Sequence, residues 1–216
     1  MPKYYPINLD LKDKKCIVIG GGEVAQRKVE TLLEVGAVVW VISPQVTDKL
    51  HHLANQAVIS CYQRDYHTGD LHGAFMAIGA TDNQQVNRQV ARDAAAANIL
   101  VNIVDQPLLC NYIVPASVIR GELVISISTG GNSPALSRHI RQQLERQFGP
   151  EYEILVDLLG KVREQVLAQV ADESKRRAIF HQLADIHPDL LKFIRTQDWD
   201  NLKARLRQIL GFEVEL

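Results

Sequence analysis

The sequence predicts an α/β fold built around a parallel β-sheet. Up to about residue 110, short runs rich in β-branched residues alternate with helical patterns, which is typical of βαβ units. The first run, residues 16–19, is apolar throughout, as expected for a strand buried on both faces. Three glycines follow it at once and precede a helical pattern. A mostly helical region follows residue 149, so we expect a second, helical part of the chain.

Each element of the first 110 residues has its own boundary signals. Apolar residues at helical spacing predict a helix over residues 24–35, which Gly36 ends. Ser43 and Pro44 end the second strand. We expect strands at residues 16–19, 38–42, 58–62, 75–80 and 100–104, and helices at residues 24–35, 49–55 and 82–97.

The pattern changes after Pro107. Residues 111–119 and 123–128 are two β-like runs joined through Gly121, which indicates either a hairpin or a crossing pair. Ser133 is a good helix N-cap and Pro134 a good first helical residue, so a helix is expected to run to residue 148.

Residues 151–210 read as helices with breaks near residues 171–172, 187–188 and 196–197. The chain length of 216 residues fits a nucleotide-binding domain of ordinary size plus a smaller unit. From the changes in pattern we predict a nucleotide-binding domain at residues 1–110, a separate segment at 111–148 and a helical domain at 149–216.

Charge and hydropathy exclude several classes of partner. The chain has 24 Lys and Arg against 25 Asp and Glu, a formal net charge of -1. Such a chain has no overall field that attracts nucleic acid or an anionic membrane. It has no apolar run of the ~18 residues that a membrane span requires, and residues 1–15 lack a secretory signal. We expect a soluble, cytoplasmic protein.

The cysteines and histidines do not form a recognisable metal or disulfide pattern. Three widely spaced cysteines without a Cys-x-x-Cys pair are typical of reduced thiols. The seven histidines have no spacing that would suggest a metal cage. The sequence therefore predicts no permanent metal site. The cysteines are Cys16, Cys61 and Cys110.

The glycine-rich segment at residues 20–25 fits the pattern G-x-G-x-x-A between a strand and a helix. In that context Gly20 permits a tight turn and Gly22 lets the backbone approach a pyrophosphate. The N–H groups at the start of the helix, at Glu23 and Val24, would hold the anion. The alternative is a glycine-rich turn that binds no nucleotide.

The acidic residue that usually binds the adenosine ribose, about 20 residues further on, is missing. Ser43, Pro44 and Gln45 stand there instead, and no arginine is present to hold a ribose phosphate. These residues favour NAD over NADP, with hydroxyl and amide groups on the ribose. A Ser-Pro turn without a ligand role is an equal alternative for Ser43.

Several segments resemble the N-terminal family of siroheme synthases, the precorrin-2 dehydrogenases. They are residues 20–37, Ala-Thr-Asp at 80–82, Val-Asn-Ile-Val-Asp at 101–105, Pro115, and Ser-Ile-Ser-Thr-Gly-Gly-Asn-Ser-Pro at 126–134. Together they cover most of residues 4–148, in the family's order and spacing. The last segment is far more specific than the glycine turn, which many dehydrogenases share.

The resemblance implies NAD-dependent oxidation of precorrin-2 to sirohydrochlorin, followed in some members by insertion of ferrous iron. It also implies a homodimer that shares residues 111–148 between subunits. Fused members carry a methyltransferase module after this region, so we expect another protein to perform the methylation.

Asp105 is the main catalytic candidate that the resemblance marks. It follows a parallel strand at the sheet edge where ligands bind, and a carboxylate there can act as general base. In chelation the same carboxylate would accept pyrrole protons or hold iron briefly. The alternative is an aspartate that only caps a loop.

A tetrapyrrole substrate carries many carboxylates, so its pocket is expected to be locally basic. Arg120, Arg138 and Arg141 lie near the family's dimer segment, and His139 follows Arg138. Ser128 and Thr129 begin a turn whose N–H groups would contact an anion. Surface positions and a simple helix cap are the alternatives for these side chains. The candidate cofactor-binding residues also include Thr81.

Two other functions remain open from the sequence. A non-catalytic NAD-binding sensor would keep the glycine turn and have no use for Asp105. A chelatase that has lost dehydrogenation would keep the fold and the substrate pocket.

Overall fold

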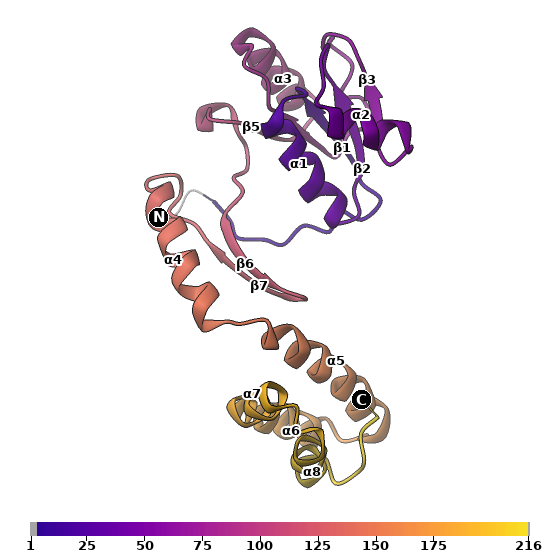
Figure 1. Cartoon of the computed structure of the whole chain (residues 1–216), viewed down its shortest axis with the longest axis vertical. Coiled ribbons are helices and arrows are strands. Elements are labelled where there is room, and N and C mark those ends of the chain that lie inside the picture. Colours follow the sequence, from indigo (N-terminus) through magenta and orange to yellow (C-terminus); the bar gives the residue numbers. More distant parts are fainter. Residues whose placement is uncertain (1–3, 216) are drawn as a thin grey trace. The chain divides into compact units, whose positions relative to one another are not determined.

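The computed structural model describes residues 4–215 and divides the chain into two compact units, Met1–Val114 and Pro115–Leu216. Figure 1 labels most elements of both units, and each unit is described by itself below. The hairpin and helix expected in residues 111–148 belong to the same unit as the C-terminal helices. The three-domain division stays a prediction. Among residues 4–215, no helix is both long and apolar enough to cross a membrane.

The first unit contains a five-stranded parallel sheet of order β3-β2-β1-β4-β5, which confirms the expected α/β fold. The chain moves outward from β1 to β3 and then returns to β4 on the other side of β1. Ligands of such sheets bind at this reversal, outside the carboxyl ends of the strands. The strands are β1 (Lys15–Ile19), β2 (Val38–Ile42), β3 (Ser60–Tyr62), β4 (Met76–Gly79) and β5 (Leu100–Ile103).

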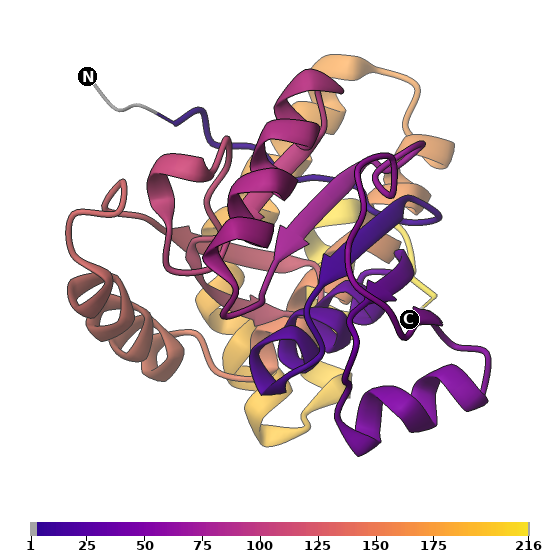
Figure 2. The same ribbon diagram turned by 90° about the horizontal axis from the view of Figure 1, so that it is seen from above.

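Helices cover both faces of this sheet, as Figure 2 shows from above. On one face Cys16 and Val18 pack with Val29 of α1 (Glu23–Glu34) in a cluster that also includes residues of α2 (Asp48–Asn55). On the other face Ile17 and Ile19 join the cluster of α3 (Gln84–Ala96). Strands that are buried on both faces read as continuous apolar runs, which explains the run at residues 16–19.

The expected strand at residues 111–119 is partly wrong, because β6 begins only at Ala116. Residues 110 and 111 instead cover the free edge of β5. The side-chain oxygen of Asn111 accepts from the N–H of Val101 at 2.7 Å, and its backbone N–H donates to the Val101 carbonyl at 3.1 Å. An edge strand needs such a cover to avoid pairing with another chain. The short 3-10 helix η1 (Pro107–Leu109) leads into this segment.

The second unit begins with an antiparallel hairpin, so the crossing pair is excluded. Strand β6 (Ala116–Arg120) pairs with β7 (Leu123–Ile127), and the turn between them passes through Gly121 at φ +55°. Helix α4 (Pro134–Gln147) lies against both strands. Ser133 caps α4 and Pro134 is its first residue, as predicted.

The rest of the second unit is a helical bundle with its own apolar core. The breaks between its helices fall close to the predicted positions. The helices are α5 (Glu151–Gln169), α6 (Glu173–Asp185), α7 (His187–Thr196) and α8 (Trp199–Leu210). The fully buried core side chains include Val162, Val166, Leu190, Leu202 and Leu206.

Candidate functional site

The turn between β1 and α1 is held by backbone contacts that only glycine permits. Gly20 has φ +121°, and a Cβ atom there would lie 2.3 Å from the carbonyl oxygen of Ala80. The end of β1 and the loop after β4 therefore touch backbone to backbone. Any larger residue at position 20 would push the two loops apart.

Gly21 is equally constrained, although the sequence pattern gave it no role. A Cβ atom there would lie 2.0 Å from the Gln45 carbonyl oxygen. The N–H of Thr47 also donates to the Gly21 carbonyl at 2.9 Å. The loop after β2 thus lies directly on the turn. The middle glycine of the triplet was the sequence signal for this contact, but its partner Gln45 is more than 20 residues away in the chain.

Gly22 differs from both neighbours because a Cβ atom there would meet no atom within 4 Å. It is the N-cap of α1, at φ -80° and ψ -174°, and no side chain among residues 4–215 caps this helix end. The first N–H groups of a helix need acceptors, and the helix dipole favours an anion there. Open space beside uncapped N–H groups therefore suits a pyrophosphate.

The predicted ribose contacts lie at the same sheet edge. Ser43 is buried, and its hydroxyl donates to the Gln45 carbonyl at 2.6 Å. Its hydrogen is thus already used inside the turn, whereas Pro44 and Gln45 are exposed. The loop at residues 43–47 offers a cofactor neither a carboxylate nor a guanidinium.

Asp105 lies in the turn after β5, is exposed, and has φ +58°. Aspartate is one of the few residues that accepts this left-handed backbone. The N–H of Val104 donates to the Gly79 carbonyl at 2.9 Å, which extends the β4–β5 ladder up to this turn. The structure thus brings Gly20, Thr81 and Asp105 to the same edge of neighbouring strands β1, β4 and β5.

The second unit contains the residues that are candidates for binding the substrate. The Ser128 hydroxyl accepts from the N–H of Gly130 at 3.1 Å, and that of Thr129 accepts from the N–H of Ser133 at 3.0 Å. Arg138 and His139 are exposed on α4.

Arg120 has a structural role that the sequence did not reveal. Its Nε donates to the Phe148 carbonyl at 2.9 Å, and its two terminal nitrogens donate to the carbonyls of Ile119 and Glu145. The guanidinium thereby satisfies carbonyls at the C-terminal end of α4, where a cation is favourable. Arg141, also considered for substrate binding, forms an ion pair with Glu145. Of the candidates, Arg120 has the least capacity left for a substrate.

Comparison with known proteins agrees with this geometry. A family model described as "Putative NAD(P)-binding" matches residues 7–116. A second, described as "Sirohaem biosynthesis protein central", matches residues 120–147. This chain belongs to the siroheme synthase N-terminal family. Residues 7–116 therefore form the family's domain for a nicotinamide dinucleotide.

Relatives in this family include the siroheme synthases of Pseudoalteromonas atlantica, 38% identical over 183 residues, and Pseudomonas aeruginosa, 39% identical over 180 residues. These alignments cover 85% and 83% of this chain but only 40% and 39% of the relatives. The chain thus spans about two fifths of their length. A solved structure named "SirC, precorrin-2 dehydrogenase" matches with a TM-score of 0.76 and 26% identity, covering 97% of this chain and 100% of that one.

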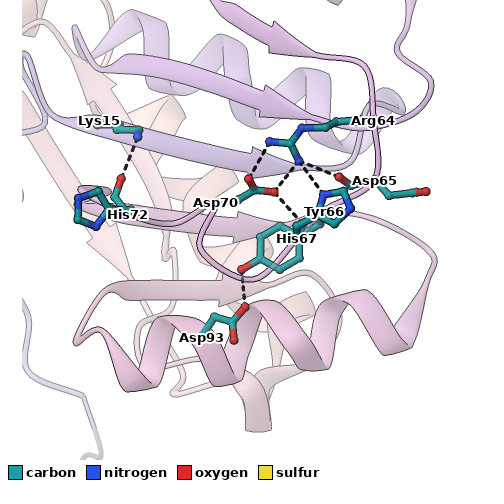
Figure 3. Close-up of polar contacts among 8 residues, drawn as sticks. All are labelled: Lys15, Arg64, Asp65, Tyr66, His67, Asp70, His72 and Asp93. Atoms are coloured by element: carbon teal, nitrogen blue, oxygen red, sulfur yellow. Dashed lines mark hydrogen bonds and ion pairs between the residues drawn. The ribbon is translucent and has the colours of Figure 1, made fainter.

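The first unit also contains a polar cluster outside the candidate site, in the crossover from β3 to β4 (Figure 3). Arg64 donates to both carboxylate oxygens of Asp70 at 2.7 Å. This pair, with the N–H of His67, holds the pKa of Asp70 below its usual value. Tyr66 donates to Asp93 of α3 at 2.8 Å, and burial and this contact raise its pKa. The cluster ties the crossover to α3 and includes none of the candidate residues.

Other groups that could carry chemistry are few. Within residues 4–215, no three His, Cys, Asp or Glu side chains are grouped so that they could hold a metal ion. All three cysteines are free, and burial raises the pKa of the Cys16 thiol to about 11. A hollow of about 440 Å³ lies between α3 and the segment after β5, lined by residues that include Arg88, Leu108 and Cys110. No predicted site residue lines it.

Proposed function

We propose that this chain oxidises precorrin-2 to sirohydrochlorin with NAD as the hydride acceptor. The observation that carries the proposal is the uncapped, open helix end at Gly22 on the same sheet edge as the exposed carboxylate of Asp105. The names of the similar proteins, siroheme synthase and precorrin-2 dehydrogenase, support it. We also propose that the protein is cytoplasmic.

The cofactor would be held mainly by backbone. The N–H groups of Gly22, Glu23 and Val24 would bind the pyrophosphate, and Thr81 would lie beside it on the next strand. Pro44 and Gln45 would face the adenosine ribose. We propose NAD rather than NADP because the loop after β2 has no cation to bind a ribose phosphate.

Asp105 would act as the general base. The oxidation removes two electrons and two hydrogens from the macrocycle, one as hydride and one as a proton. NAD supplies the hydride acceptor when it is bound. The Asp105 carboxylate takes the proton and returns it to solvent, which its exposure allows. We further propose that ferrous iron is a second substrate, for insertion into sirohydrochlorin, and that the Asp105 carboxylate binds it briefly, since hard oxygen ligands suit transient Fe(II).

The carboxylates of the tetrapyrrole would be bound from the second unit. Arg138 and His139 are exposed and can donate to a carboxylate. The hydroxyls of Ser128 and Thr129 accept N–H bonds, and their own hydrogens have no acceptor among the described residues. We propose a homodimer through residues 111–148, as the family resemblance implies. One exposed apolar pair on the hairpin, Ile119 opposite Val124, would be covered in such a dimer.

The test is turnover of precorrin-2 with NAD by purified Asp105→Asn and wild-type protein. Asparagine keeps the shape and accepts the left-handed backbone, so the variant is expected to fold and to bind NAD as wild type does. The rate of NADH formation should fall by roughly 10²- to 10⁴-fold. An unchanged rate would remove Asp105 from the mechanism.

Two outcomes would favour the other functions. Wild-type protein that binds NAD but forms no NADH would be a sensor rather than a dehydrogenase. Wild-type protein that inserts Fe(II) into sirohydrochlorin and never oxidises precorrin-2 would be a chelatase only.

A further inference from the structure

Asn87 is a polar residue in the core whose bonding is only half satisfied. Its side chain is 2% exposed. The Nδ2 group donates to the carbonyl of Thr81 at 2.9 Å, but Oδ1 has no hydrogen-bond partner among the described residues. A buried acceptor without a donor is destabilising. Folding alone therefore does not explain why an amide occupies this position.

The space for the amide comes from Gly79, the last residue of β4. A Cβ atom at Gly79 would lie 2.8 Å from Oδ1 of Asn87 and 2.6 Å from Cδ1 of Ile103. The unpaired oxygen thus lies beside the end of β4, in a space that it shares with the apolar side chain of Ile103. Leucine has a similar volume and no polar atoms, so it suits this environment better than asparagine does.

The bond that Asn87 does make leads directly to the candidate cofactor site. Its acceptor is the carbonyl of Thr81, in the loop between β4 and α3. The neighbouring carbonyl, that of Ala80, is the atom against which Gly20 packs. A shift of the Thr81 carbonyl would move Ala80 and with it the glycine turn. Asn87 therefore holds in place the loop after β4, against which the glycine turn packs.

We propose that Asn87 is a positioning residue of the nicotinamide dinucleotide site, retained for cofactor affinity although its unpaired oxygen is unfavourable in the folded state. The proposal rests on the cofactor binding proposed above, and not on the identity of the oxidised substrate. Asn87 itself does not contact the cofactor, because its side chain is buried behind Thr81. It acts by holding the Thr81 carbonyl.

The experiment compares NAD binding by calorimetry with thermal unfolding in the same variants of the full chain. Asn87→Leu removes both the bond to Thr81 and the unpaired oxygen. It is expected to weaken NAD binding about tenfold, close to the contribution of one hydrogen bond. Tm should change little, because the cost of losing the bond to Thr81 offsets the gain from removing the unpaired oxygen. A role in folding alone predicts the reverse, with a lower Tm and unchanged affinity.

Asn83→Ala is the matched control on the same helix. The Asn83 side chain caps α3 by accepting from the N–H groups of Gln85 and Val86, and it makes no bond to the Thr81 carbonyl. Its loss should lower Tm and leave the affinity for NAD within about twofold. Asn87→Ala serves if the leucine variant does not fold, with the same loss of affinity expected at a lower Tm.

Affinity of Asn87→Leu within twofold of wild type would overturn the proposal. So would equal losses of affinity in Asn87→Leu and Asn83→Ala, because general loosening of α3 would then explain both. Wild-type protein that binds NAD without turnover would contradict the proposed dehydrogenase activity, and the affinities of the variants would still test the role of Asn87. Wild-type protein that binds no NAD would contradict both the proposed activity and the proposed role of Asn87.

Discussion

Two glycine-containing turns of this chain precede helices, and they differ in what occupies the helix end. Before α4, Ser133 accepts from the N–H of Leu136 at 3.3 Å, and Thr129 accepts from the N–H of Ser133. The side chains around Gly130 and Gly131 thus satisfy N–H groups of their own turn. Before α1, Gly22 leaves the helix end without any side-chain cap among the described residues.

Glycines before a helix therefore do not by themselves mark an anion site. What matters is whether a side chain already satisfies the N–H groups. At α1 a bound ligand would have to supply the acceptor, whereas at α4 the side chain of Ser133 supplies it. The first turn is therefore a binding site that depends on backbone, and the second is a stable helix cap that presents hydroxyls.

The largest expected effect is that of Gly20→Ala. The added Cβ would meet the Ala80 carbonyl in a backbone region that disfavours alanine, so we expect a loss on the order of 3 kcal/mol in the free energy of unfolding. Gly130→Ala also has a positive φ but meets no atom within 4 Å, and should cost about 1 kcal/mol. Urea denaturation measures both. Equal losses would contradict the close contact of the first turn.

Ser133→Ala tests the cap of the second turn. Removal of the hydroxyl leaves the N–H of Leu136 without its acceptor, and should reduce the free energy of unfolding by about 1 kcal/mol. NAD affinity should not change, since α4 is not the proposed anion site. A loss of NAD affinity measured by calorimetry would mean that the two turns do not have separate roles.

The smallest effect concerns the crossover loop, which is held by charges rather than by close backbone contact. The Arg64 guanidinium lowers the pKa of Asp70, so the folded state binds this proton less readily than the unfolded state. The resulting stabilisation is present above the ordinary pKa of 3.8 and is lost as the pH falls through the lowered value. Asp70→Asn should lower Tm by about 2 °C at pH 7, and the difference should disappear in acid below that value.

A Tm difference for Asp70→Asn that persists unchanged at pH 2.5, roughly a unit or more below the ordinary range for aspartate, would contradict the ion pair as its cause. Gln63→Ala on the same loop is a suitable control, since it removes no charge.

The local parts of the fold and the site were predictable from sequence. The turn at residues 20–25, the position of Asp105 after a strand and the cap at Ser133 all depend on residues close together in the chain. The hydrophobic runs also fixed which strands are buried, because both faces of the sheet are covered.

The parts that were missed depend on contacts between distant segments. Gly21 packs on Gln45, Asn87 occupies the space left by Gly79, and no local pattern announces either contact. Residues 112–114 look like part of a strand because they are aromatic or β-branched. Asn111 instead binds the edge of β5 through both its side chain and its backbone N–H. Arg120 looked like a free cation, and only the folded unit shows the carbonyls that it binds.

The central claim is that the open backbone at Gly22 receives the pyrophosphate, and calorimetric titration of NAD into wild type and Gly22→Val tests it most directly. Valine accepts the extended backbone of Gly22, and its Cβ atom meets no atom within 4 Å, so the variant should fold. Its Tm should be slightly below that of wild type, because valine is a poorer N-cap than glycine. Its branched side chain should occupy the space of the ligand and weaken NAD binding by roughly 100-fold. A variant that binds NAD as tightly as wild type would contradict the account.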